Sequence, residues 1–280
     1  MSTPSIQWYP GHIAKAERQL KEQLKRVDVV LEVLDARIPL ASHHPHVLQW
    51  IGSKPRVLIL NRMDMISDSV RSQWQEWFDR QGESPYFTNS KQGKGIKAVS
   101  QAAQSAGVEM NQRRRDRGMR PRPVRAVVIG FPNVGKSALI NRLLGRKAVT
   151  SARRAGVTRQ LRWVRISEEI ELLDAPGVIP VKLDNQKDAV KLAICEDIGE
   201  AAYDNQLVAT ALVDLLVELD FEPVLTRYSL ELGLMNGAEY VHALGTQRYQ
   251  GDVERAAVQL LNDFRKGLLG AIPLELPPHD

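Results

Sequence analysis

The apolar residues of this chain change their pattern about two thirds of the way along it. Short, nearly continuous apolar runs bounded by turn residues are typical of strands that are buried on both faces of a sheet. Such runs predict strands at residues 27–34, 56–60, 85–88, 126–129 and 170–173. Apolar residues at helical spacing predict helices at residues 13–25, 47–52, 67–81, 95–106 and 138–144.

Beyond residue 180 the strand-like runs stop, and helical periodicity appears at residues 187–219 and 252–269. Strands that alternate with helices are typical of a mostly parallel sheet covered by helices. The sequence therefore predicts an α/β domain at residues 1–183, with a basic connector at about 108–123, followed by a small all-helical domain at residues 184–280.

The segment 130–137 reads G-F-P-N-V-G-K-S and lies between a predicted strand and a predicted helix. Glycines at this spacing let backbone N–H groups converge on phosphate oxygens, and the helix N-terminus adds partial positive charge. Lys136 would place a cation on the outer phosphates, and Ser137 a hydroxyl on Mg²⁺. The candidate phosphate-binding residues here are Asn133, Val134, Gly135, Lys136, Ser137 and Ala138.

A second phosphate-side motif, Asp174-Ala175-Pro176-Gly177, follows the predicted strand at 170–173. Asp174 would hold Mg²⁺ through water, and the Gly177 N–H would contact a γ-phosphate. Between the two motifs, Thr158 is the candidate for a loop residue that closes on Mg²⁺. The alternatives are a plain turn at Asp174-Ala175-Pro176-Gly177 and a solvated basic loop around Thr158.

Two further predicted strands end in polar residues that suit a nucleobase. Asn61-Arg62-Met63-Asp64 follows the strand at 56–60, and Asn89-Ser90 follows the strand at 85–88. The Asp64 carboxylate can accept hydrogen bonds from the guanine N1–H and exocyclic amine, a donor pair that adenine lacks. Guanine is therefore the predicted base, with Asn61, Arg62, Asn89 and Ser90 around it. Alternatively, Asp64 caps a helix.

The base-side motifs precede the phosphate motifs, which is the reverse of the usual order in small GTPases. With this order, the chain resembles the circularly permuted GTPases. Residues 6–12 (I-Q-W-Y-P-G-H) and 35–39 (D-A-R-I-P), together with the helical tail, resemble the ribosome biogenesis GTPase A group. The resemblance implies a permuted P-loop GTPase fold and a slow GTPase that assists maturation of the large ribosomal subunit, is stimulated by that particle, and contacts its rRNA. A GTP-gated RNA-binding protein with negligible turnover is the alternative.

The chain departs from the family pattern at informative positions. Arg62 replaces the usual lysine of the base motif, which alters reach and donor geometry. Val178 stands where many GTPases carry a water-positioning glutamine. The resemblance assigns the catalytic role to His12 instead, whose alternative is a solvent-exposed residue at a helix start. It also implies that Asn133 helps to hold K⁺ in potassium-dependent members.

Composition and charge predict the cellular compartment and the kind of binding partner. The chain has one cysteine, Cys195, which excludes internal disulfides. It has no apolar run of membrane-spanning length. We therefore expect a cytoplasmic, monomeric protein without a membrane partner. The formal net charge is +5, and arginines crowd two zones. Such zones favour a polyanion such as rRNA; solvated surfaces are the alternative. The arginines of the connector zone are Arg113, Arg114, Arg115, Arg117, Arg120, Arg122 and Arg125.

Overall fold

The computed structural model describes residues 18, 20–145, 162–174, 185–199 and 202–278. Within them, six strands form one sheet in the order β3-β2-β1-β4-β6-β5. All neighbours pair in parallel except β5, which is antiparallel to β6. The strands are β1 (Val29–Asp35), β2 (Arg56–Asn61), β3 (Tyr86–Thr88), β4 (Val124–Ile129), β5 (Arg162–Arg165) and β6 (Ile170–Asp174).

The central strands are apolar on both faces because helices cover both sides of the sheet. One face packs against α4 (Ile96–Asp116) and α5 (Lys136–Leu143). The other face packs against residues 20–24, α2 (Val47–Ile51) and α3 (Asp68–Arg80). The predicted α/β class and mostly parallel sheet are confirmed. Strand β5 was missed, because the sequence R-W-V-R has no apolar run and the strand pairs at one sheet edge.

Helix α4 is longer than its sequence pattern predicts. The apolar periodicity fades near residue 106, but the helix continues to Asp116, so the first half of the basic connector is helical. Its added turns carry good helix formers, and arginines in the last turn face the negative end of the helix dipole. Gly118, with φ +69°, follows the helix end.

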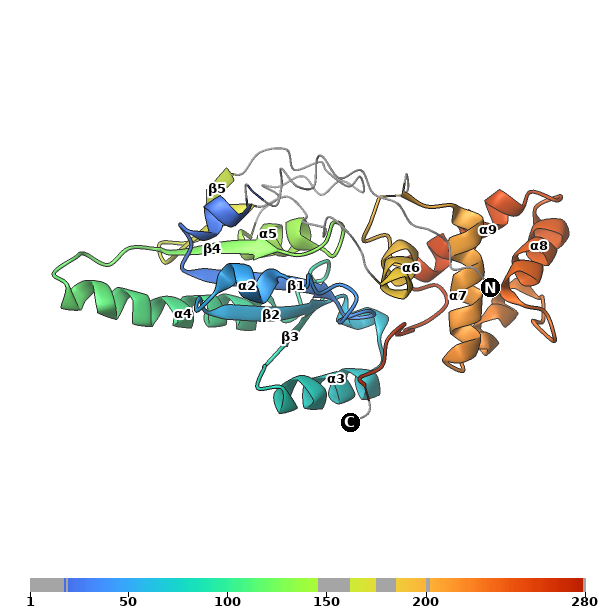
Figure 1. The fold of residues 1–280 in the computed structure, drawn as a ribbon, viewed down its shortest axis with the longest axis horizontal. Helices are drawn as coiled ribbons and strands as arrows, with labels where there is room; N and C mark the ends of the chain where they lie inside the picture. The colour runs from blue at the N-terminus through green and yellow to red at the C-terminus, as the bar shows by residue number, and fades with distance from the viewer. Residues whose placement is uncertain (1–17, 19, 146–161, 175–184, 200–201, 279–280) are drawn as a thin grey trace.

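The C-terminal part consists of helices at one end of the sheet, seen at the right of Figure 1. The periodic run 187–219 is divided, because α6 ends at Ile194 and Glu196 adopts a left-handed backbone with φ +64° before Asp204 caps α7. The elements are α6 (Gln186–Ile194), α7 (Asn205–Glu218), the 3₁₀ helix η3 (Glu222–Tyr228), α8 (Gly237–Arg248) and α9 (Val253–Arg265).

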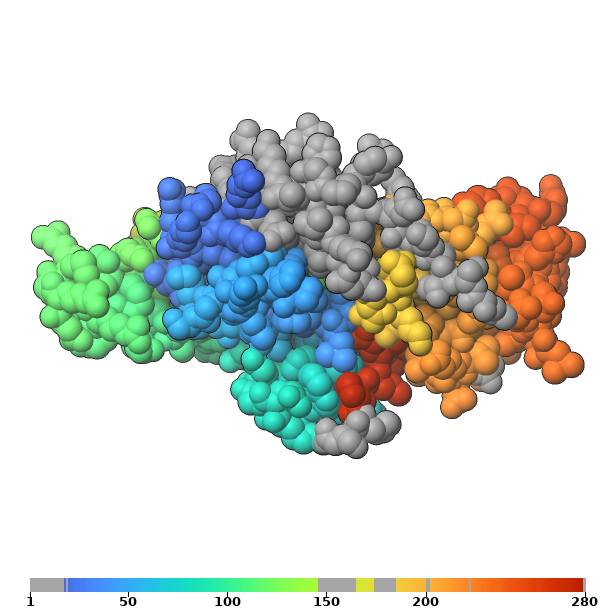
Figure 2. Space-filling view, in the orientation of Figure 1, coloured from blue at the N-terminus to red at the C-terminus, as the bar shows by residue number. Residues whose placement is uncertain are grey.

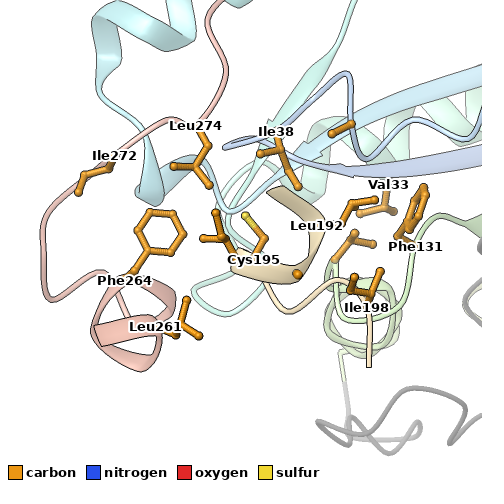
Figure 3. Packing of buried hydrophobic residues seen from close by; sticks show 14 of the residues in the cluster. Val33, Ile38, Phe131, Leu192, Cys195, Ile198, Leu261, Phe264, Ile272 and Leu274 are labelled. Atoms are coloured by element: carbon orange, nitrogen blue, oxygen red, sulfur yellow. The ribbon is translucent and has the colours of Figure 1, made fainter. Parts of the chain in front are cut away.

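The helical part and the sheet share one apolar core. Figure 3 shows Val33 and Phe131 of the sheet part near Leu192 and Ile198, and Cys195 among buried apolar side chains. The chain then returns, because the N–H groups of Leu274 and Glu275 donate to Arg37 O at 2.9 and 3.1 Å. Figure 2 shows this last segment, in red, between α3 and the helices. The sheet part and the helical part are thus packed together, and the predicted boundary at residues 183/184, which lies outside the described residues, stays a prediction.

None of the helices in the described ranges is both long enough and apolar enough to span a bilayer.

Candidate functional site

The loops at the carboxyl ends of β2, β3 and β4 converge on one pocket of about 290 Å³. Register explains the convergence, since Asn61 of β2 pairs with Asp35 of β1 and with Thr88 of β3. Open α/β sheets bind ligands at this edge. The pocket is lined by Asn61, Arg62, Asp64, Met65, Asn89, Ser90, Lys91, Asn133, Gly135, Lys136, Ser137, Ala138, Glu196, Asn262, Arg265 and Lys266.

The loop between β4 and α5 needs glycine at two positions for reasons of space. Gly130 has φ +146°, and a Cβ there would lie 2.3 Å from Val33 O. Gly135 has φ +108°, and a Cβ there would lie 2.1 Å from Asn61 Nδ2. Both distances are shorter than any van der Waals contact. The loop is thus pressed against β1 on one side and the base-side loop on the other.

Lys136 begins α5 and is buried beneath the same loop. Its ammonium donates to Phe131 O at 2.7 Å and to Gly130 O at 3.2 Å. A buried ammonium beside a helix N-terminus makes a strongly anion-attracting site. Ser137 and Ala138 line the pocket next to it. Val134, also predicted to bind phosphate, is fully buried and does not line the pocket.

Asn61 fastens the loops to one another. Its Nδ2 donates to Val134 O at 2.7 Å, which ties β2 to the phosphate loop. Its Oδ1 accepts from Thr88 Oγ1 at 3.1 Å and from the N–H and hydroxyl of Ser90 at 3.0 and 2.8 Å. Three donors share the Asn61 oxygen and its Nδ2 donates to Val134 O, so Asn61 braces the loops around the pocket.

Asp64 and Asn89 line the pocket, and each has polar side-chain atoms without a hydrogen-bond partner in the described ranges. Asp64, on the 3₁₀ helix η1 (Met63–Met65), is exposed, and no hydrogen bond or ion pair engages its carboxylate within the described ranges. Asn89 Nδ2 is buried without a hydrogen-bond partner in the same ranges. The carboxylate is an acceptor pair and the amide a donor, the complement of a purine edge.

Behind the pocket lies a buried network of charged side chains. The Asp35 carboxylate accepts from Arg37 Nη2 at 2.7 Å and lies 3.4 Å from Arg62 Nε. Burial acts to raise the pKa of Asp35, but the charges of Arg37 and Arg62 hold it below its ordinary value. Arg62 also donates to Asn133 O at 2.6 Å. Asp35 and Arg37 thus form a structural ion pair that reaches the pocket through Arg62.

Asp197 joins this network from the helical part. Its carboxylate is buried and makes no hydrogen bond within the described part of the chain, and Arg62 Nη2 lies 3.9 Å from its Oδ1. Burial, and then the charge of Asp35, raise the pKa of Asp197 well above its ordinary value. Nearby, Asn133 Nδ2 donates to Glu196 O at 2.7 Å. The phosphate loop therefore contacts the helical part directly.

The sequence analysis missed the pocket residues Met65, Lys91, Glu196, Asn262, Arg265 and Lys266. No local motif marks them. The last three lie in or just after the final turn of α9, where basic residues are ordinary because they suit the helix dipole. Only the packing of the C-terminal helices against the sheet brings them to the pocket.

Several predicted site residues cannot be placed. His12, Thr158 and Gly177 lie outside the described residues, as does the residue at 178. The backbone of Asp174 ends β6 and pairs with Val128 of β4, which precedes the phosphate loop by two residues. Asp174 is thus on the strand beside the phosphate loop, and its role with Mg²⁺ stays a prediction.

The sheet order and the pocket define a P-loop nucleotide-binding protein in which the base-side loops precede the phosphate loop along the chain. Residues 125–222 match the model of a 50S ribosome-binding GTPase family. Ribosome biogenesis GTPase A of Bacillus cereus is 35% identical over 97% of this chain and 94% of its own length. The mitochondrial ribosome-associated GTPase 1 of Xenopus tropicalis is 30% identical over 96% and 94%.

The chain therefore belongs to the ribosome biogenesis GTPase A family of circularly permuted GTPases. The solved structure of GDP-bound YlqF from T. maritima has the same fold, with a TM-score of 0.66 and 23% identity, covering 93% of this chain and 99% of that one. The predicted GTPase class and permuted order are confirmed. The protein is a GTP-hydrolysing ribosome assembly factor, and GTPases of this kind generally use Mg²⁺.

Proposed function

We propose that this GTPase assists maturation of the large ribosomal subunit, turns over slowly by itself, and is stimulated by the ribosomal particle. The observation that carries the proposal is one pocket that joins base-side and phosphate-side loops and is also walled by the C-terminal helices. Such a pocket links nucleotide binding to a second surface of the molecule. The names of the relatives and of the matched family support a ribosomal partner.

Within the pocket, Asp64 reads guanine, while Asn61, Arg62, Asn89 and Ser90 shape the base side. The unpaired Asp64 carboxylate supports this role. Asp64→Asn should weaken binding of GDP and GTP and partly accept xanthine nucleotides, whose ring carries a carbonyl in place of the exocyclic amine. Titration calorimetry with both sets of nucleotides tests it. Equal affinity of the wild type for ATP and GTP would contradict the assignment.

The phosphates bind to the loop from Asn133 to Ala138 and to Gly177. Ser137, Thr158 and Asp174 would hold Mg²⁺, with Asp174 acting through water. When bound, Mg²⁺ neutralises charge that develops on the phosphates. Asn133 is the proposed K⁺ ligand, since its amide nitrogen is engaged with Glu196 O and its side-chain oxygen has no protein partner in the described part. Hydrolysis measured in K⁺ and in Na⁺ at equal ionic strength tests that role.

His12 is the proposed catalytic residue, because Val178 leaves the usual water-positioning place apolar. A positioned imidazole would orient the attacking water. His12→Ala should keep GTP affinity within about threefold and lower subunit-stimulated hydrolysis by about a hundredfold. Single-turnover hydrolysis with saturating large subunits is the measurement. An unchanged rate would remove His12 from the mechanism.

The rRNA contact is proposed for the C-terminal helices and for the far end of α4. This end and the loop after it extend beyond the sheet, opposite the helical part (Figure 1). Arg115, Arg117 and Arg120 are exposed there. Arg122 is instead held by Asp28 at 2.7 and 2.9 Å, so it belongs to the fold. Exposed arginines that form no ion pair in the described part of the chain are suited to phosphate contacts.

The decisive experiment compares GTP turnover alone, with large subunits and with small subunits. Stimulation by large subunits only is expected. A triple exchange of Arg115, Arg117 and Arg120 to Gln should weaken cosedimentation and flatten its salt dependence, while Arg71→Gln on α3 serves as the control. Turnover that stays equally low with every particle would favour the alternative, a GTP-gated RNA-binding protein. We further propose that the protein acts in the cytoplasm as a monomer.

A further inference from the structure

The end of α9 forms a wall of the pocket. Asn262, Arg265 and Lys266 are spaced three and four residues apart, so they lie on one face of a helix turn. This face lines the same pocket as Asp64 and Lys136. Residues nearly two hundred positions apart in the sequence thus share one ligand-sized space.

The position of α9 is fixed by contacts with residues that do not line the pocket. The Arg265 guanidinium donates to Ala193 O, Ile194 O and the Tyr203 hydroxyl, each at 2.9 Å. It therefore binds the carbonyl end of α6, where Ala193 O also accepts from the Glu196 N–H at 3.0 Å. The preceding Phe264 ring lies 5.2 Å from the Arg37 guanidinium. These contacts hold the end of α9 against α6 and Arg37.

The geometry also shows which end of the pocket α9 reaches. A Cβ on Gly267 would lie 3.1 Å from Met65 Sδ, so the chain after α9 touches the residue that follows Asp64. Lys136 and Ser137 mark the opposite, phosphate end. Arg265 is engaged with α6, but no hydrogen bond or ion pair holds the Asn262 amide or the Lys266 ammonium in the part of the chain that is described.

We propose that Asn262 and Lys266 contact the nucleoside end of the bound nucleotide, so that the helical part supplies one wall of the nucleotide site. The Asn262 amide offers a donor and an acceptor, and the Lys266 ammonium offers donors, which suit ribose hydroxyls and base carbonyls. Because GDP and GTP share the nucleoside, both lose the same contacts when these side chains are removed. The proposal rests on the assignment of the pocket to a guanine nucleotide.

The test is titration calorimetry of Asn262→Ala and Lys266→Ala with GDP and with a non-hydrolysable GTP analogue. Each variant should bind both nucleotides about three- to tenfold more weakly, which is the range for one hydrogen bond. Lys187→Ala is the matched control, since Lys187 is an exposed lysine of α6 that does not line the pocket. Its affinities should equal those of the wild type.

Two results would overturn the proposal: affinities within twofold of the wild type, or a loss confined to the GTP analogue, which would place the contact at the γ-phosphate. Asp64→Asn, measured in parallel, separates this failure from failure of the pocket assignment. If Asp64→Asn weakens binding and the α9 variants do not, only the α9 proposal is wrong. If none of the three changes binding, the pocket assignment is wrong.

Discussion

The sheet part and the helical part bury different kinds of side chain. The sheet part encloses charged and amide groups, among them Asp35, Arg37, Asn61, Asn89 and Lys136. In the described residues of the helical part, the buried polar or charged side chains are Asp197, Asp263 and Glu275. The remainder of its core is apolar.

The location of those three acids is instructive. Asp263 satisfies the Tyr228 hydroxyl inside the helical part. Asp197 lies beside Arg62, and Glu275 accepts from the Leu40 N–H at 2.8 Å, so both face the sheet part. Burying a charge is costly unless partners compensate it. Two of the three buried acids of the helical part therefore mark where it joins the sheet part.

The largest effect is expected in the sheet part, from a substitution at Gly135. Gly135→Ala should weaken nucleotide binding by about a hundredfold, or about 3 kcal/mol, because the new Cβ would displace the Asn61 amide and break its bond to Val134 O. Gly145→Ala is the control, since Gly145 has φ +63° and open space around it. Calorimetry with GDP measures both. Equal losses of GDP affinity in the two variants would show that backbone strain at a positive φ, and not the contact with Asn61, weakens binding.

The join at Glu275 is the next largest test. Glu275→Ala removes the acceptor of the Leu40 and Ala41 N–H groups and the partner of Lys191, whose ammonium lies 3.1 Å away. Leaving these groups buried should lower the free energy of unfolding by about 2–3 kcal/mol. Urea denaturation measures it, with the exposed Glu231→Ala as control. A loss below about 0.5 kcal/mol would mean that the C-terminal segment does not hold the two parts together.

Arg62 tests whether the charged network serves the pocket. Arg62→Lys keeps the charge but replaces the two separate donors, Nη2 on Asn133 O and Nε beside Asp35, with a single ammonium of different reach. We expect nucleotide affinity to fall about fivefold, close to 1 kcal/mol. Arg71→Lys, at an exposed pair with Asp68 on α3, should change nothing. Unchanged affinity of Arg62→Lys would show that the lysine found in related GTPases serves equally well here.

Substitution of Asp197 should have the smallest effect, and it should stabilise the protein near pH 7 where the substitutions above are harmful. Because its pKa is raised, the folded protein keeps a proton that the unfolded chain releases above the ordinary value of 3.8. Its contribution to stability is therefore present below that value and is lost as the pH rises through the folded-state pKa. Asp197→Asn cannot ionise, so it should melt at or above the wild-type temperature near pH 7 and lose this advantage near pH 4.

Thermal melts between pH 4 and 8 provide the measurement. Asp214→Asn is the control, because Asp214 on α7 accepts from the Gly237 N–H within the helical part. A difference between Asp197→Asn and wild type that grows on acidification would contradict the raised pKa.

The sequence alone determined five of the six described strands, the mostly parallel character of the sheet, and most of the pocket. A strand buried on both faces needs a continuous apolar run, and parallel strands bring their carboxyl ends to one edge, so Asn61, Asp64, Asn89 and Lys136 had to meet once those strands were recognised. The sequence also identified the glycines of the phosphate loop, because only glycine fits their backbone conformation and close contacts.

Only the tertiary structure decided what lies behind and beside that pocket. Asp35 and Arg37 lie two residues apart in the chain, but the sequence could not show that Arg62 and Asp197 join their ion pair, because Asp197 comes from the segment after α6 in the helical part. The α9 residues at the pocket carry no motif, since a helix turn with polar residues looks the same whether it faces solvent or a ligand. Helix packing is set by nonspecific apolar contacts between distant segments, and those contacts leave no periodic signal of which polar face they will turn towards a site.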